Sequence, residues 1–161
     1  MPIVLARVDS RLIHGVVVTD WFGALNPKRY MVIDDELSKD ESLKATMRMA
    51  KPAGTGMSII DTEKAIHNFK NGNYDTQRVF VLVKDPTTIT KLIDAGIEVP
   101  KVDVGIIFMA DGKTKVSSYV AMDQEDARKL KEIQQRDVPV VLQYLPNDPE
   151  EPIDRYYSKI K

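Results

Sequence analysis

Residues 3–21, IVLARVDSRLIHGVVVTDW, carry the pattern that decides the fold. Ile3–Ala6 is a short apolar run after a proline, and it predicts a buried strand. Charged residues follow, then His14 and Gly15, and then a run that predicts a helix with Trp21 on its inner face. The order strand, polar turn, helix is typical of an open α/β sheet, in which ligands bind at the carboxyl ends of the strands.

The polar turn of this stretch holds the side chains that a phosphate site needs. They are two arginines, a carboxylate and a histidine: Arg7, Arg11, Asp9 and His14. Arginine binds phosphate oxygens through two parallel N–H groups, and a neutral imidazole is a competent nucleophile. The backbone N–H groups of Gly15 and Val16, at the start of the following helix, add anion donors. We therefore expect a phosphate site in which His14 is the nucleophile.

Two residues of the turn are expected to support His14. Arg11 lies three residues before it, within reach across a tight turn, and is expected to stabilise the charge of a phosphoryl group. Asp9 has three roles open to it: it orients Arg11, it holds one imidazole nitrogen protonated, or it caps the turn.

A charged rim is predicted next to this turn. Asp34 and Asp35 follow one predicted strand and Lys84 follows another, so parallel strands would bring them to the edge of the sheet that carries His14. Arg7 either pairs with Asp34 or Asp35 or joins them on the rim. We expect the rim of Arg7, Asp34, Asp35 and Lys84 to set the charge of a docking surface.

Composition narrows the class of protein. The 161 residues are 43% hydrophobic and 29% charged, with a net charge of -1, which suits one globular domain and argues against a nucleic-acid partner. The absence of cysteine excludes disulfides, thiolate metal sites and cysteine nucleophiles. No apolar run approaches the ~20 residues of a membrane span, no signal peptide is expected, and no cluster of metal ligands stands out.

Hydrophobic periodicity and turn residues predict strands that alternate with helices. The expected strands are residues 3–6, 30–33, 57–60, 79–83, 102–108 and 138–142, with an antiparallel return over 116–122. The expected helices begin near residues 16, 42, 62, 86 and 123, and the tail over 146–152 is expected to be irregular. This alternation predicts an α/β fold: a single domain over residues 1–161, with a mostly parallel open sheet of about seven strands and helices on both faces.

The segment from Arg7 to Trp21 resembles the active-site loop of the enzyme IIB subunit of the mannose/fructose/sorbose family of the bacterial sugar phosphotransferase system. That family carries a segment close to R-I-D-x-R-L-I-H-G-Q-V-V-T-x-W, and here it stands as RVDSRLIHGVVVTDW. The similarity covers nearly the whole chain and continues through Val32–Glu36, Lys39–Asp40, Phe80–Lys84 and Asp103–Gly105. The chain departs from the family pattern at Val16, which replaces a glutamine, and over residues 103–107, where DVGII replaces a typical N-V-G-G-M.

The resemblance implies a cytoplasmic phosphoryl carrier. His14 would accept a phosphoryl group from the phosphohistidine of a IIA domain and pass it to a hexose or amino sugar that enters through the membrane subunits IIC and IID. These partners would hold the protein at the inner face of the membrane. The resemblance implies no cofactor and leaves a homodimer open, and the family's mostly parallel seven-strand sheet with one antiparallel strand agrees with the predicted fold.

Two other functions compete with this one. A histidine phosphatase also uses an Arg/His-Gly loop, but it needs a second histidine as a phosphate clamp and a carboxylic general acid. His67 is poorly placed for this role, because it is predicted to be a surface or half-buried residue in the middle of a helix. A non-catalytic module that binds a phosphorylated partner is the third function. Trp21 is expected in the core rather than in a sugar pocket, and Gly54-x-Gly56 precedes a strand, which does not match a dinucleotide-binding fingerprint.

Overall fold

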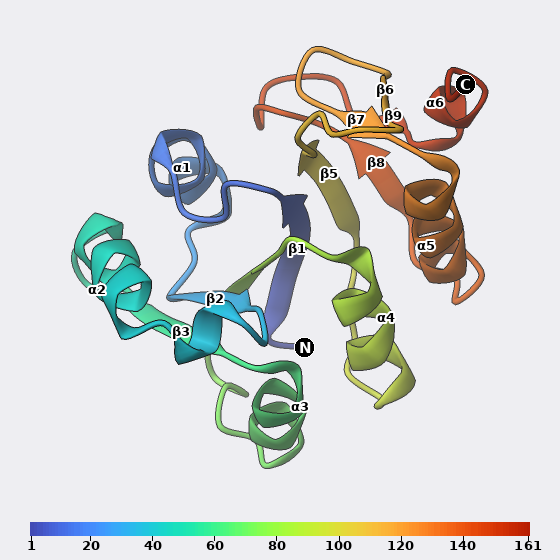
Figure 1. Ribbon diagram of the computed structural model, residues 1–161. Helices are drawn as coiled ribbons and strands as arrows, with labels where there is room; N and C mark the ends of the chain where they lie inside the picture. Colours follow the sequence, from blue (N-terminus) through green and yellow to red (C-terminus); the bar gives the residue numbers. More distant parts are fainter.

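The fold is built around a central seven-strand sheet, and the computed structural model describes residues 1–161 (Figure 1). The strands lie in the order β3-β2-β4-β1-β5-β8-β9, and all neighbouring pairs are parallel except β8 with β9. Their bounds are β1 (Ile3–Asp9), β2 (Arg29–Ile33), β3 (Gly56–Ile60), β4 (Val79–Val83), β5 (Val102–Ile106), β8 (Val140–Leu142) and β9 (Glu151–Pro152). The predicted α/β class and the mostly parallel sheet are confirmed.

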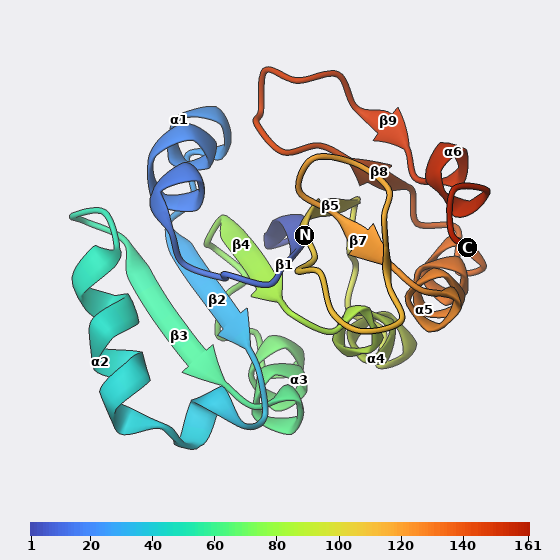
Figure 2. The same ribbon diagram turned by 45° about the horizontal axis from the view of Figure 1, so that its top comes forward.

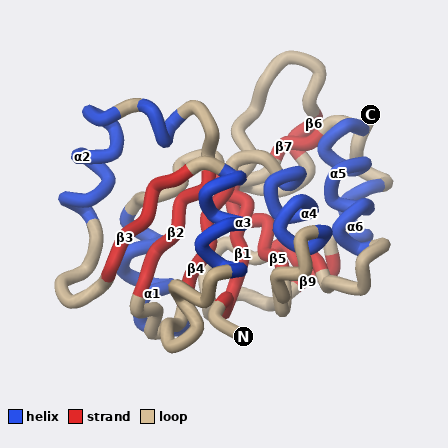
Figure 3. The backbone as a smooth tube through the Cα atoms, turned by 90° about the horizontal axis from the view of Figure 1, so that it is seen from below, coloured by secondary structure: helices blue, strands red, loops and turns tan.

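Helices cover both faces of this sheet (Figure 3). They are α1 (Trp21–Leu25), α2 (Glu41–Ala50), α3 (Thr62–Lys70), α4 (Pro86–Asp94), α5 (Gln124–Gln134) and α6 (Asp154–Tyr157). A core of 28 buried residues joins the sheet to α3, α4 and α5, and a core of 10 buried residues, Trp21 among them, lies on the opposite face under α1 and α2. None of these helices has the length and apolar character that crossing a membrane requires.

Aspartates start four of the helices. The side chains of Asp40, Asp61, Asp85 and Asp123 each accept a hydrogen bond from a backbone N–H in the first turn of α2, α3, α4 and α5. A carboxylate at this position satisfies an otherwise unpaired N–H and interacts favourably with the positive end of the helix dipole. These bonds are local in sequence, which is why the predicted helix starts near residues 42, 62, 86 and 123 agree with the structure.

The carboxyl ends of β1 and β5 form the place where this type of fold binds ligands. The two strands are neighbours, but the chain leaves β1 towards β2 on one side and leaves β5 towards β8 on the other. Such a reversal opens a crevice at the strand ends. A second reversal lies between β2 and β4, because the chain continues from β2 to β3 and from β4 to β5. The segment with His14 follows β1, whereas Asp34 and Asp35 follow β2 and Lys84 follows β4.

The predicted end of β1 is wrong, whereas the predicted start of a helical segment near residue 16 is confirmed. The strand continues through Asp9, so Arg7 and Asp9 lie on the strand instead of in the turn. The next element is a π-helical turn, Val16–Asp20, which runs into the short α1. Insertions of π geometry into helices are rare and occur frequently at functional sites.

The carboxyl-terminal third differs from prediction in two places. The expected antiparallel return over 116–122 forms one short strand, β7 (Ala121–Met122), which pairs with β6 (Thr114–Lys115) outside the main sheet. Val120 adds a single isolated bridge, parallel to Ile107. The tail expected to be irregular contributes β9, antiparallel to β8. Pro152 is tolerated there because an edge strand does not need every N–H group for pairing.

Candidate functional site

Asp9, at the end of β1, is the centre of the site. Its Oδ1 accepts hydrogen bonds from the backbone N–H groups of Arg11 (2.8 Å) and Leu12 (3.2 Å), and Leu12 takes a left-handed conformation with φ of 58°. Its Oδ2 accepts from Arg7 Nε (2.9 Å) and lies 2.8 Å from His14 Nε2. Of the roles left open for Asp9, it therefore holds the imidazole and caps the turn, and it makes no bond to the Arg11 guanidinium.

The contact with Asp9 decides which nitrogen of His14 is available. A carboxylate only accepts hydrogen bonds, so the Nε2 atom carries the proton and Nδ1 carries the lone pair. Nδ1 is buried and has no hydrogen-bond partner, and the whole residue is only 7% exposed. His14 thus has one buried nitrogen without a partner, in a ring whose orientation is fixed from the other side.

Arg7 is a buried structural cation. Its side chain is fully buried, and besides Asp9 it binds Asp103 Oδ2 on β5 (2.7 Å) and the backbone carbonyls of Gln143 and Tyr144 (both 3.1 Å). The guanidinium also lies 5.3 Å from the centre of the Trp21 ring, within cation–π range. The sequence-based placement of Arg7 on an exposed rim, or in a pair with Asp34 or Asp35, is therefore wrong.

The backbone of β5 is shaped to admit this arginine. A Cβ atom added at Gly105 would overlap the guanidinium of Arg7, so only glycine leaves room for the side chain. Arg7 on β1 is paired in register with Asp103 on β5, and Asp103 lies two residues before Gly105. Asp103 and Gly105 thus form one side of the Arg7 pocket, and sequence reasoning missed both because they lie about 100 residues away along the chain.

The buried cluster has one arginine, Arg7, for two carboxylates, those of Asp9 and Asp103. Burial works to raise the pKa of Asp9, but the hydrogen bond from His14 and the charge of Arg7 outweigh it, so this pKa lies below its usual value. Burial raises the pKa of Asp103 to about 7, although Arg7 opposes the shift. One guanidinium cannot neutralise two fully buried carboxylates, and the second carboxylate therefore retains a proton more readily.

Arg11 and the backbone after His14 surround the site from outside. The Arg11 side chain is exposed, and the structure records no hydrogen bond between its guanidinium and His14. The N–H groups of Gly15 and Val16 are not used as donors in any hydrogen bond of the chain, whereas the His14 carbonyl accepts from Val18 (3.0 Å). Two unused backbone donors therefore follow His14 directly.

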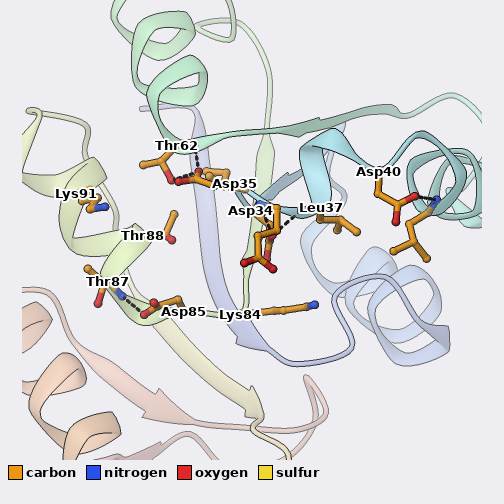
Figure 4. Close-up of a pocket in the computed structure, with 13 residues that line it drawn as sticks. Asp34, Asp35, Leu37, Asp40, Thr62, Lys84, Asp85, Thr87, Thr88 and Lys91 are labelled. Carbon is orange, nitrogen blue, oxygen red and sulfur yellow. Dashed lines mark hydrogen bonds between the residues drawn. The ribbon is translucent and has the colours of Figure 1, made fainter.

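The predicted rim residues Asp34, Asp35 and Lys84 lie together at the second reversal of the sheet, around an open cavity of about 450 Å³ (Figure 4). Asp34 Oδ1 accepts from the N–H groups of Glu36 and Leu37, and Asp35 Oδ1 accepts from both the backbone and the hydroxyl of Thr62. The bonds from Thr62 lower the pKa of Asp35. Asp34 thus fixes the turn after β2, and Asp35 joins that turn to the start of α3, on the side of β4 away from Asp103.

Two further expectations concern residues outside the site. His67 is exposed on α3 and its Nε2 contacts the Asn71 side chain (2.9 Å), as its predicted surface position requires. Trp21 is buried in the core as predicted, and its Nε1 donates to the Tyr144 carbonyl (3.0 Å). No group of three or more potential His, Cys, Asp or Glu ligands converges anywhere in the structure.

Comparisons with known proteins agree on one family. The family described as "PTS system sorbose subfamily IIB component" matches residues 3–161. The sorbose-specific EIIB component of Lacticaseibacillus casei is 36% identical over 149 residues, which cover 92% of this chain and 91% of that protein. The mannose-specific EIIAB component of Escherichia coli K12 is 32% identical over 160 residues, but the match spans 99% of this chain and only half of that protein. The crystal structure of the IIBSor domain of the Klebsiella pneumoniae sorbose permease superimposes with a TM-score of 0.93 and 28% identity, covering 99% of this chain and 98% of that one.

Proposed function

Because the chain belongs to the sorbose subfamily of IIB components of the phosphotransferase system, we propose that Nδ1 of His14 accepts a phosphoryl group from a IIA phosphohistidine. The observation that carries this assignment is the 2.8 Å contact between His14 Nε2 and Asp9 Oδ2, which leaves Nδ1 without a partner. The proposal deepens the family assignment, which by itself gives a phosphotransfer component of a sugar phosphotransferase system.

The transfer exchanges one P–N bond for another. The lone pair of His14 Nδ1 attacks the phosphorus, the P–N bond of the donor histidine breaks, and the donor ring leaves with the electron pair. The proton on His14 Nε2 stays in place, so the phosphorylated ring becomes an imidazolium, whose positive charge the Asp9 carboxylate offsets. When a sugar hydroxyl oxygen later attacks the phosphorus, the P–Nδ1 bond breaks, its electron pair stays on Nδ1 and the ring returns to its neutral form, while the hydroxyl proton leaves to water.

The charge of the phosphoryl group is met by donors outside the buried cluster. A phosphoryl group carries about -2 charge, and phosphoryl transfer depends on alignment and charge stabilisation. The unused N–H groups of Gly15 and Val16 are suited to its oxygens, and the exposed Arg11 side chain is free to move towards them. Arg7 acts as a positioning residue, since it reaches His14 only through Asp9.

The partners follow from this role. A IIA domain supplies the phosphoryl group, and the membrane subunits IIC and IID present the sugar at the cytoplasmic face. The name of the EIIAB relative is consistent with a IIA unit as the neighbour of such a chain. Asp34, Asp35 and Lys84 form a charged flank of the docking face, where they would affect association rate and salt dependence.

Mass spectrometry and NMR of the chain after incubation with a phosphorylated IIA domain test the proposal. We expect an acid-labile phosphate on His14, attached to Nδ1 by NMR of the ring nitrogens, and no phosphate on the His14→Ala variant. Phosphate that persists in His14→Ala, or that attaches to Nε2, would contradict the assignment. Release of free phosphate would favour a histidine phosphatase, and binding without phosphorylation would favour a non-catalytic module.

A further inference from the structure

An apolar cavity of about 280 Å³ lies beside the His14 turn, on the opposite side from Asp34 and Asp35. Its lining includes Arg11, Ile107, Phe108, Met109, Tyr119 and Tyr144. The backbone N–H of Phe108 donates to Ser10 Oγ (3.1 Å), and Ser10 N–H donates to the Ile106 carbonyl (2.9 Å). This surface is therefore attached directly to the turn that carries His14, where the segment after β5 runs beside the end of β1 (Figure 2).

The side chains of this surface are unusually exposed for their type. Phe108 is 53% exposed, Met109 65% and Tyr119 49%, and together they are half of the chain's large exposed apolar residues. Apolar residues that gather at the surface mark interaction sites more often than the same residues scattered singly. We call Phe108, Met109 and Tyr119 the apolar platform.

Tyr119 connects the apolar platform to the buried cluster. The Tyr119 ring stacks on Tyr144, with centroids 3.6 Å apart and planes within 5° of parallel. The backbone carbonyl of Tyr144 in turn accepts from Arg7 and from Trp21. A partner that binds the platform thus contacts a surface that is linked through Tyr144 to the residues around His14.

Charge distinguishes this flank of His14 from the other. The only charged residues of the apolar cavity are Arg11 and Lys115, both cationic. The cavity at the opposite flank is lined by five carboxylates and only two lysines, Lys84 and Lys91, so its lining is net negative. A phosphohistidine that carries about -2 charge is attracted to the first flank and repelled by the second.

We propose that the apolar platform, with Arg11 and Lys115 at its edge, is the docking surface for the IIA phosphohistidine domain. A protein that brings its histidine to His14 covers about 800 Å² around it, enough to extend over the adjacent platform. The inference rests on the proposed phosphorylation of His14 and adds to it the surface on which the donor is held.

Two phosphoryl donors separate docking from chemistry. Phosphoramidate is a small molecule that needs no docking surface, whereas the IIA part of the mannose-specific EIIAB relative, phosphorylated beforehand, does. The test variant is the double substitution Phe108→Ser/Met109→Ser, and both of these side chains are already exposed. The matched control compares the single variant Met109→Ser with Met49→Ser, because Met49 is also an exposed methionine (87%) and lies on α2. We expect kcat/KM with phospho-IIA to fall about 10-fold or more in the double variant, in the range of an interface hot spot. The phosphoramidate rate, and both rates of Met49→Ser, stay within about twofold of the unchanged chain.

The other outcomes each overturn the proposal in a distinguishable way. Equal phospho-IIA rates in the double variant and the unchanged chain exclude the platform as the IIA surface. If the double variant loses only the transfer to sugar in IIC/IID membranes, the platform belongs to the interface with those subunits. Phosphoramidate labelling of His14 without any transfer from phospho-IIA excludes docking of this donor. A dimer that the double variant splits in sedimentation assigns the platform to a second copy of the chain. Failure of both donors to label His14 refutes the proposed function itself.

Discussion

Gly105→Ala tests whether the buried arginine is necessary for the site. The new Cβ would occupy the place of the Arg7 guanidinium, so the side chain of Arg7 must move or β5 must shift. Arg7 has no room to move, because it is fully buried and binds Asp9, Asp103 and two backbone carbonyls. We therefore expect the substitution to break at least one of its two buried ion pairs.

The expected size of the effect follows from that loss. Breaking a buried ion pair leaves an uncompensated charge and costs about 3–5 kcal/mol, a large part of the roughly 5–15 kcal/mol that stabilises a typical domain. With a urea m value of about 2 kcal/mol/M, the unfolding midpoint should fall by roughly 1.5–2.5 M. Phosphoramidate labelling of His14 should slow as well, since Asp9 loses the partner that fixes its position.

Urea unfolding followed by circular dichroism measures the midpoint, with Gly23→Ala as the control. Gly23 lies in α1, and a Cβ there meets no atom within 4 Å, so alanine should be neutral or stabilise by about 0.5–1 kcal/mol. A midpoint for Gly105→Ala within about 0.3 M of the unchanged chain would refute the argument, because it would mean that Arg7 can leave its pocket at little cost.

Three further substitutions give separate predictions. Asp9→Asn should slow phosphoramidate labelling of His14 about 100-fold or more, because an amide no longer fixes the Nε2-protonated ring; a rate within twofold in single-turnover experiments would contradict this. Arg11→Lys should leave the unfolding midpoint unchanged and slow transfer from phospho-IIA about 10-fold, since the charge remains but the planar fork is lost; an unchanged rate would exclude Arg11. Asp103 has a pKa raised to about 7 by burial, so the folded state keeps a proton that the unfolded state loses near pH 4, and stability should fall as the pH rises from about 5 to 7. That fall, about 1.4 kcal/mol per pH unit at most, should be absent from the urea midpoints of Asp103→Asn; equal slopes in both proteins would contradict the assignment.

Local signals in the sequence explain most of what could be predicted. The fully apolar β4 and the aspartate helix caps depend on neighbours in the chain, and the structure has them where the sequence places them. The end of β1 was predicted wrongly at Ala6, because Arg7 and Asp9 read as surface residues. They can be buried because Asp103 and His14 supply partners for them, and the first of these partners comes from a strand that no local pattern connects to β1.

The candidate site divides in the same way. His14, Asp9 and Arg11 share one short stretch, so their proximity follows from the sequence, and the structure adds which atom of Asp9 faces which group. The apolar platform could not be predicted, since Phe108 and Met109 resemble the continuation of a buried strand. They become exposed because β5 ends at Ile106 and the segment beyond it leaves the sheet.

The burial of His14 Nδ1 sets an upper limit on the rate of the proposed phosphoryl transfer. Nδ1 is buried, so the proposed phosphorylation requires the ring or the turn around it to open before any phosphorus can come within bonding distance. This opening is a first-order event, and it gives transfer a maximum rate that no excess of donor can raise. At low donor concentration the encounter with the donor is rate-limiting, and at high donor concentration the opening of the ring or turn is rate-limiting.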